Sequence, residues 1–147
     1  MIKEYLNIIL TDADEGNLIL LERTLQDFKI PSKVKTFNTG SELMDSLHQN
    51  ILTAEVLFMD YRIPGKPCLE CLSEIRSNPK FDHLTTVIYS ENVSPAEEEE
   101  IFIAGANVFM KKPDNYRDMK KRVADIISVT WQYYTAGLNK NNFIMKV

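Results

Sequence analysis

Short runs of apolar residues alternate along this chain with longer stretches in which apolar residues recur every three or four positions. The short runs predict five strands, at residues 6–10, 33–37, 56–59, 86–89 and 108–110. The longer stretches predict helices, at about residues 18–28, 41–50, 69–77, 95–104 and 119–130. This alternation is typical of a parallel sheet that carries helices on both faces.

The predicted fold class is therefore α/β. We expect a flavodoxin-like, doubly wound sheet of five parallel strands in the order 2-1-3-4-5, with five helices, because right-handed crossovers and a switch point between the first and third strands give this order. The short run at 33–37 is expected at an edge. Two helix starts carry capping-box patterns, Thr39 with Glu42 and Ser94 with Glu97, the second followed by Pro95 in the first turn.

The size and composition fit one globular domain, since the chain has 147 residues, 44% of them apolar and 26% charged. From about Tyr133 onward no sustained period continues, so we expect a domain over residues 1–132 and a C-terminal extension over 133–147, without a second domain. Residues 143–145 are candidates to dock back onto the domain.

A net charge of -4 without a basic stripe disfavours direct nucleic-acid binding. The opening MIKEYLNIIL fits neither a signal peptide nor a membrane span, which predicts a cytoplasmic protein without a membrane partner.

Cys68 and Cys71 form a C-x-x-C pair inside a predicted helix. No second pair accompanies them and no His stands nearby in the sequence, which disfavours a zinc or redox role. Cys71 falls on the core face of that helix, so we expect a buried structural thiol there.

Four predicted strands end in side chains that are able to take part in chemistry. Asp12, Asp60, Ser90 and Lys112 follow the first, third, fourth and fifth strands. In a doubly wound sheet these carboxyl ends converge on one crevice. Two close carboxylates favour a divalent cation, while a lysine and a hydroxyl suit the oxygens of a phosphoryl group. The sequence therefore predicts Mg²⁺-assisted phosphoryl transfer to a carboxylate.

The same segments resemble the receiver domains of two-component response regulators over roughly residues 5–131. The resemblance rests on the stretches IILTDADEGN, LFMDYRIPGKPCLECLSEIR, VIYSEN and GANVFMKKP. Several phrases, including LECLSEIR and the C-terminal NNFIM, are similar to the stand-alone receivers common in Bacteroidetes.

By position, the resemblance implies that Asp60 is the phosphoacceptor and that Lys112 binds the phosphoryl group. It implies that Ser90 is the switch hydroxyl, that Phe109 is the aromatic switch, and that a cis peptide bond precedes Pro113. Taken alone, Ser90 is an ordinary loop residue and Phe109 an ordinary core residue.

The resemblance also implies a metal site and signalling partners. Mg²⁺ would be held by Asp12, by Asp60 and by the backbone carbonyl of Arg62. The partners would be a histidine kinase or phosphotransfer protein and a downstream protein target. The protein would then be a single-domain signalling switch rather than an enzyme.

Three positions depart from the family pattern. Ala13 stands where the family has the second of two adjacent acids, a direct Mg²⁺ ligand, and Asp14 lies one position too far along. Glu91 replaces the small residue after the switch hydroxyl, and Cys68 replaces a usual Gly. We therefore expect weak Mg²⁺ binding, and Glu91 crowding or repelling an incoming phosphodonor.

These departures leave other functions open. Ala13 and Glu91 support a receiver-like interaction module that works without phosphate. A third hypothesis takes Asp12 as the nucleophile and Asp14 as the general acid of a haloacid-dehalogenase-like phosphatase, although it leaves Asp60 unexplained. Asp12 is also compatible with a plain turn or helix cap.

Overall fold

The structure is a computed structural model that describes residues 5–49, 54–136 and 144–147. Within these residues the strands form one parallel sheet in the order β2-β1-β3-β4-β5-β6. The expected order of the first five strands is confirmed, with β2 at an edge. The strands are β1 (Leu6–Thr11), β2 (Ser32–Phe37), β3 (Val56–Asp60), β4 (Thr85–Ser90), β5 (Val108–Lys111) and β6 (Met145–Lys146).

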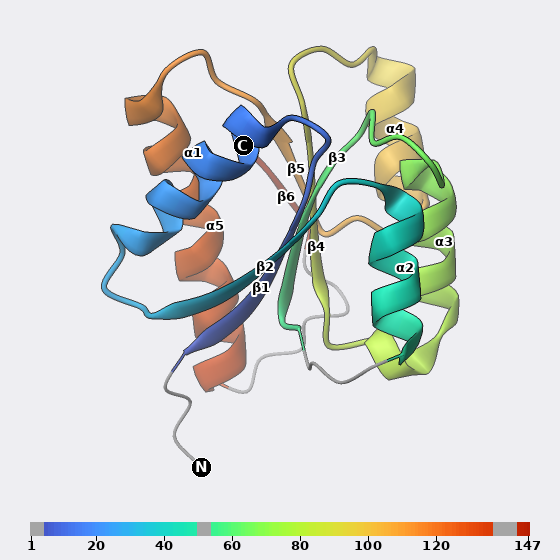
Figure 1. Ribbon diagram of the computed structural model, residues 1–147, viewed down its shortest axis with the longest axis horizontal. Helices are drawn as coiled ribbons and strands as arrows, with labels where there is room; N and C mark the ends of the chain where they lie inside the picture. The colour runs from blue at the N-terminus through green and yellow to red at the C-terminus, as the bar shows by residue number, and fades with distance from the viewer. Residues whose placement is uncertain (1–4, 50–53, 137–143) are drawn as a thin grey trace.

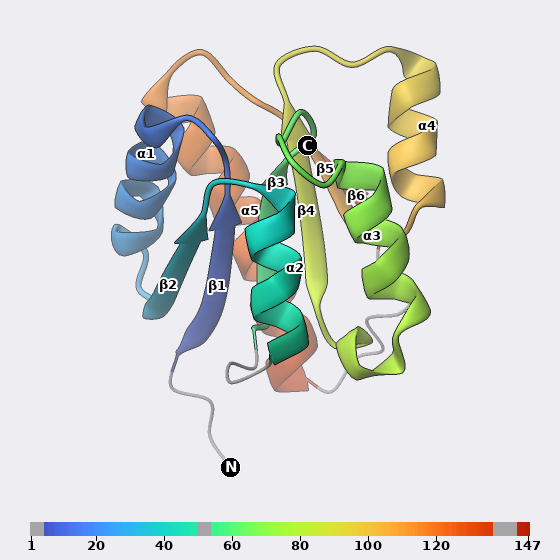
Figure 2. The same ribbon diagram turned by 45° about the vertical axis from the view of Figure 1, so that its right-hand side comes forward.

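Helices cover both faces of the sheet, as expected. Figure 1 shows α1 and α5 on one side and α2, α3 and α4 on the other, and Figure 2 shows the same layers from a second direction. No helix in the described part of the chain is long and apolar enough to cross a membrane. The helices are α1 (Glu15–Gln26), α2 (Gly40–Gln49), α3 (Cys68–Ser77), α4 (Pro95–Ile103) and α5 (Tyr116–Ala136), with a short 3-10 helix at Pro79–Phe81.

The central strand β3 shows why an unbroken apolar run forms here. Leu57 and Met59 pack into the core under α2, α3 and α4, whereas Val56 and Phe58 pack into the core under α1 and α5. All four side chains are fully buried. A strand with helices on both faces needs apolar residues at successive positions, and this strand delivers Asp60 at its carboxyl end.

Local capping explains where two helices begin. The Ser94 hydroxyl accepts a 3.1 Å hydrogen bond from the Glu97 amide, and the Glu97 carboxylate accepts one of 2.8 Å from the Ser94 amide. This completes the predicted capping box of α4. The Thr39 hydroxyl accepts a 3.0 Å bond from the Glu42 amide at the start of α2.

A close backbone contact holds the loop after β3 in place. The Gly40 amide donates a 3.0 Å hydrogen bond to the Pro64 carbonyl. A Cβ atom at Gly40 would lie 2.1 Å from the carbonyl oxygen of Lys66, so only glycine allows this approach. The start of α2 thereby fixes the loop that follows Asp60.

The end of the chain differs from the expectation. Helix α5 continues to Ala136, beyond the expected loss of periodicity at Tyr133. Met145 and Lys146 then form a sixth strand, which pairs in parallel with β5. The predicted count of five strands was therefore one too few. The expected docking of residues 143–145 holds for Met145, while residue 143 lies outside the described residues.

Candidate functional site

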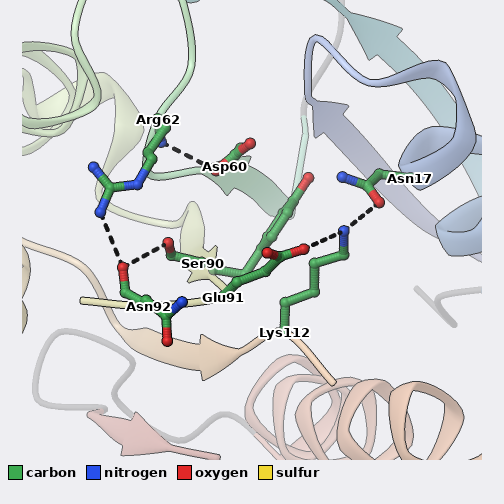
Figure 3. A pocket seen from close by; sticks show the side chains of 8 residues that line it. Asn17, Asp60, Arg62, Ser90, Glu91, Asn92 and Lys112 are labelled. Carbon is green, nitrogen blue, oxygen red and sulfur yellow. Dashed lines mark hydrogen bonds and ion pairs between the residues drawn. The ribbon is translucent and has the colours of Figure 1, made fainter. Parts of the chain in front are cut away.

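Most of the predicted site residues meet at the carboxyl edge of the sheet. Asp60 ends β3, Ser90 ends β4 and Lys112 follows β5. These side chains open into one pocket of about 320 Å³ (Figure 3). The pocket is lined by Asn17, Asp60, Arg62, Tyr89, Ser90, Glu91, Asn92 and Lys112.

Asp60 is a half-buried carboxylate with few compensating contacts. Its Oδ1 accepts a 3.0 Å hydrogen bond from the Arg62 amide. Burial raises the pKa of Asp60, which Asp12 raises further, while the Arg62 amide and the charges of Lys112 and Arg62 oppose the shift. The raised pKa means that the cost of burying the carboxylate exceeds the stabilisation from these contacts. A further cation or hydrogen-bond donor beside Asp60 would therefore stabilise its ionised form.

Ser90 and Arg62 both bind a neighbouring carbonyl instead of Asp60. The Ser90 hydroxyl donates to the Asn92 carbonyl at 3.3 Å, and the Arg62 guanidinium donates to the same oxygen at 3.0 Å (Figure 3). The Ser90 side chain is 5% exposed and forms part of the pocket wall. The Ser90 hydroxyl is therefore within the site, but it donates its hydrogen bond to Asn92 and not to Asp60.

Lys112 reaches across the pocket from β5. Its Nζ donates to the Asn17 side-chain oxygen at 2.5 Å and lies 3.5 Å from a carboxylate oxygen of Glu91 (Figure 3). The Lys112 amide also donates to the Ser90 carbonyl at 2.9 Å, which ties the end of β5 to the end of β4. Glu91, expected to crowd the site, thus pairs with its lysine.

Asp12 does not line the pocket, although it follows β1 as predicted. One of its carboxylate oxygens accepts a 2.8 Å bond from the Asp14 amide. The other accepts bonds from the Asn17 side chain at 3.0 Å and from the Tyr89 hydroxyl at 2.6 Å. Asp12 is only 1% exposed, and both side-chain donors belong to the pocket wall. Asp12 therefore acts in this structure as a buried turn acceptor beneath the site.

Sequence reasoning missed Tyr89 and Asn17. Tyr89 lies in the buried strand β4 and is 1% exposed, and burial beside Asp12 raises the pKa of its phenol. A buried tyrosine needs a hydrogen-bond partner near its tip, and this rule was a usable signal. Asn17 lay in the quoted DEGN stretch, but nothing in its spacing indicated a bridge between Asp12 and Lys112.

The remaining predicted residues have simpler surroundings. Phe109 is 3% exposed and packs in the core under α2, α3 and α4. The peptide bond before Pro113 is trans, since the described residues contain no cis bond, so the cis bond implied by the resemblance was wrong. Cys68 and Cys71 are free and buried, and burial raises the pKa of Cys71 to about 11, which keeps that thiol protonated.

Comparison with known proteins defines the family. The sequence pattern of the response regulator receiver domain family matches residues 8–124. The chain belongs to this family, whose members act in two-component signalling. It is similar to the two-component response regulator ARR17 of Arabidopsis thaliana, 26% identical over 130 residues that span 81% of this chain and 83% of the relative.

A second relative is named as an enzyme. The cyclic di-GMP phosphodiesterase response regulator RpfG of Xanthomonas campestris is 25% identical over 131 residues, which cover 86% of this chain but only 33% of RpfG. The match therefore concerns only part of RpfG, and receiver domains are typically non-enzymatic signalling domains.

Solved structures support the fold. The Mn(2+)-bound response regulator Rcp1 matches with a TM-score of 0.75 at 21% identity, over 83% of this chain and 91% of that one. The phosphorylated cyanobacterial phytochrome response regulator RcpA matches with a TM-score of 0.77 at 19% identity, over 91% and 96% of the two chains. At such identities the likeness shows the receiver fold alone.

Receiver domains typically bind a divalent cation such as Mg²⁺. The residues present here fit that group poorly. Asp12 already receives three hydrogen bonds, and Ala13 offers no oxygen ligand on its side chain. Within the described residues no cluster of three His, Cys, Asp or Glu side chains is placed to hold a metal. Of the three expected ligands, only Asp60 and Arg62 line the pocket.

Proposed function

We propose that this protein is a response regulator that accepts a phosphoryl group on Asp60 from a histidine kinase or phosphotransfer protein. Membership of a two-component family implies a histidine kinase partner. The observation that carries the proposal is the pocket in which Asp60, Ser90 and Lys112 meet at the ends of three strands. Residues 1–132 would form the receiver domain and residues 133–147 its C-terminal extension.

In the proposed reaction an Asp60 oxygen attacks the phosphorus of a phosphohistidine. The new P–O bond forms as the P–N bond breaks, and the ring nitrogen keeps the electron pair of that bond. Lys112 would neutralise charge on the phosphoryl oxygens, and the Ser90 hydroxyl would donate a hydrogen bond to one of them. Both residues line the pocket and need only exchange their present partners.

Those exchanges supply the proposed switch. Before phosphorylation Ser90 binds the Asn92 carbonyl and Lys112 binds Asn17 and Glu91. A phosphoryl group on Asp60 would attract Ser90 and Lys112, so the two states differ in contacts at the ends of β4 and β5. Phe109, which is buried in β5, would adjust its packing. The output would be a protein-binding face built from α4, β5 and α5, and no direct contact with nucleic acid is proposed.

Mg²⁺ binding is expected to be weak. Asp60 and the Arg62 backbone carbonyl are the expected ligands that remain at the pocket, whereas Asp12 is held below it. A cation that uses Asp12 must first displace the Tyr89 phenol or the Asn17 amide, which costs binding free energy.

The hydrogen bonds of Asp12 and Lys112 favour one alternative, a receiver-like module that binds its partner without phosphate. In the unphosphorylated protein Asp12 already binds the Tyr89 hydroxyl, and Lys112 already binds the Asn17 side chain. The phosphatase alternative has little support, because Asp12 is buried and the Asp14 side chain caps α1 by accepting from the Gly16 amide at 2.8 Å.

Phosphorylation with a small donor tests the proposal. The protein is incubated with acetyl phosphate, with and without Mg²⁺, and the product is followed by intact mass spectrometry. We expect an adduct that is lost at alkaline pH and absent from Asp60→Asn. If the wild type remains unmodified by both acetyl phosphate and a cognate kinase, the phosphate-independent module replaces the proposal.

A further inference from the structure

The edge strand β6 is held mainly through its backbone. The Met145 amide donates to the Asn107 carbonyl at 2.7 Å, and the Val147 amide donates to the Phe109 carbonyl at 3.0 Å. In return the Lys111 amide donates to the Val147 carbonyl at 3.0 Å. Figure 1 shows β6 alongside β5, at the edge of the sheet that would otherwise be open.

The side chains of this segment alternate between the core and solvent. Met145 and Val147 pack against the core under α1 and α5. Lys146 points to the opposite side of the pleat and pairs with Glu98 of α4 at 2.9 Å. The edge of β5 therefore accepts an extended segment with an apolar, basic, apolar pattern, in parallel orientation.

The segment has few contacts with which to resist replacement. β6 has only two residues, and in the ion pair between Lys146 and Glu98 the lysine side chain is 67% exposed, which limits how much the pair stabilises the strand. A few backbone hydrogen bonds gain about as much free energy as ordering the segment costs. An incoming strand with the same pattern can compete with such an occupant.

Exposed apolar side chains precede both β5 and β6 in the chain. Among the described residues three large apolar side chains are strongly exposed, and two of them are Ile103, at 77%, and Ile144, at 69%. Ile103 ends α4 just before the chain enters β5, and Ile144 directly precedes β6. Glu99 and Glu100 of α4 are also exposed. A partner at this edge would thus find apolar and acidic surface beside the strand.

We propose that the edge of β5 is a strand-docking site for a partner protein, and that residues 144–147 are its resident intramolecular occupant. The partner supplies an extended segment in which a basic residue stands between two apolar ones. It adds in parallel to β5, as in other cases of strand addition at a sheet edge. The basic residue pairs with Glu98, and the acidic flank of α4 favours a positively charged partner.

The docking site is connected to the phosphoacceptor pocket. Val147 bonds to Lys111, the residue before Lys112, and to Phe109. The regulatory meaning of the docking site rests on the proposed function, since a change at Lys112 would alter how β5 holds the segment. Strand binding itself needs no phosphate, so it is measured on the unphosphorylated chain and on Asp60→Asn, where failure of phosphorylation leaves the result unaffected.

The test uses a fluorescent peptide with the sequence FIMKV, that of residues 143–147, and full-length protein. Val147→Pro removes the amide that donates to Phe109, whereas Val147→Ala keeps it. We expect the peptide to bind Val147→Pro at least about tenfold more tightly than wild type or Val147→Ala, because only the proline variant removes a backbone hydrogen bond that holds the resident strand. Circular dichroism checks that all three are folded.

Two matched pairs make the outcome specific. N-methylation of Val147 in the peptide should abolish binding, whereas N-methylation of Lys146 should not, since that amide faces away from β5. Glu98→Lys should weaken binding more than Glu99→Lys. Equal binding by the two methylated peptides, or no binding to Val147→Pro, overturns the proposal. Self-association of Val147→Pro in sedimentation, reversed by the peptide, would instead assign the edge to a second copy of this chain and overturn the partner assignment.

Discussion

The Tyr89 hydroxyl donates a 2.6 Å hydrogen bond to the Asp12 carboxylate, and both side chains are 1% exposed. This contact joins the end of β4 to the end of β1 beneath the pocket. It occupies an oxygen that a divalent cation would otherwise use. Together with Ala13, it leaves Asp60 and Glu91 as the carboxylates that line the pocket among the described residues.

Tyr89→Phe should therefore free Asp12 and change the response to Mg²⁺. Without Mg²⁺ we expect the free energy of unfolding to fall by about 1.5 kcal/mol, because a buried carboxylate loses one donor. Mg²⁺ should bind the variant more tightly than wild type and recover part of that loss. Urea unfolding with and without Mg²⁺, and titration calorimetry, measure both effects.

Tyr5→Phe is the control, because Tyr5 precedes β1 at the end opposite to Asp12, so this substitution removes a phenol away from the pocket. Ala13→Asp should also tighten Mg²⁺ binding, by adding an oxygen ligand. Unchanged affinity in both Tyr89→Phe and Ala13→Asp would mean that the cation never uses the Asp12 side of the site.

Glu91→Gln should speed phosphorylation by acetyl phosphate. The Glu91 carboxylate lies 3.5 Å from the Lys112 ammonium and is 70% exposed, so it diverts the lysine and repels an anionic donor. We expect a rate increase of a few-fold, because an exposed pair is worth at most about 1 kcal/mol. The difference should shrink at high salt, which screens exposed charges. A rate that is unchanged at low salt would show that Glu91 does not hinder the reaction.

Lys112→Ala should slow phosphorylation and destabilise the phosphorylated form. The Lys112 side chain is 17% exposed and reaches into the pocket, whereas Lys111 is exposed and its side chain does not line it. Loss of a charged hydrogen bond to the phosphoryl group predicts a decrease of at least about tenfold. Lys111→Ala is the matched control and should behave as wild type. Equal effects of the two substitutions would argue against a specific role for Lys112.

Asp60→Asn should stabilise the unphosphorylated protein at neutral pH. Burial raises the pKa of Asp60, so wild-type stability is fully present below the ordinary carboxyl pKa of about 3.9 and is lost as pH rises through the raised value. The asparagine variant lacks this loss, so its advantage should grow with pH across that window. Denaturant unfolding at several pH values, with exposed Asp45→Asn for comparison, tests this. An advantage of Asp60→Asn that is independent of pH would contradict the raised pKa.

The order of the first five strands could be predicted because its signals are local. Alternating strands and helices, two-sided burial of residues 56–59 and the capping box at Ser94 each require only neighbouring residues. Right-handed crossovers then leave few topologies. The convergence of Asp60, Ser90 and Lys112 followed from the same rule, since strand ends meet at one edge.

The missed features depend on contacts between residues far apart in the sequence. A two-residue strand such as β6 carries no periodicity, and it forms only because the edge of β5 is available. Tyr89 was predicted as a buried strand residue, but its bond to Asp12 depends on how β1 and β4 lie across β3. For the same reason the presence of Asp12 after β1 did not reveal that it lies below the pocket.

Mapping the phosphorylated residue shows whether Asp60 accepts the phosphoryl group. Protein treated with acetyl phosphate is reduced with borohydride, which converts an acyl phosphate of aspartate to homoserine, and peptides are sequenced by mass spectrometry. We expect homoserine at position 60 alone, in a peptide that Asp60→Asn does not yield. Homoserine at Asp12 or Asp14, or at any position other than 60, would contradict it.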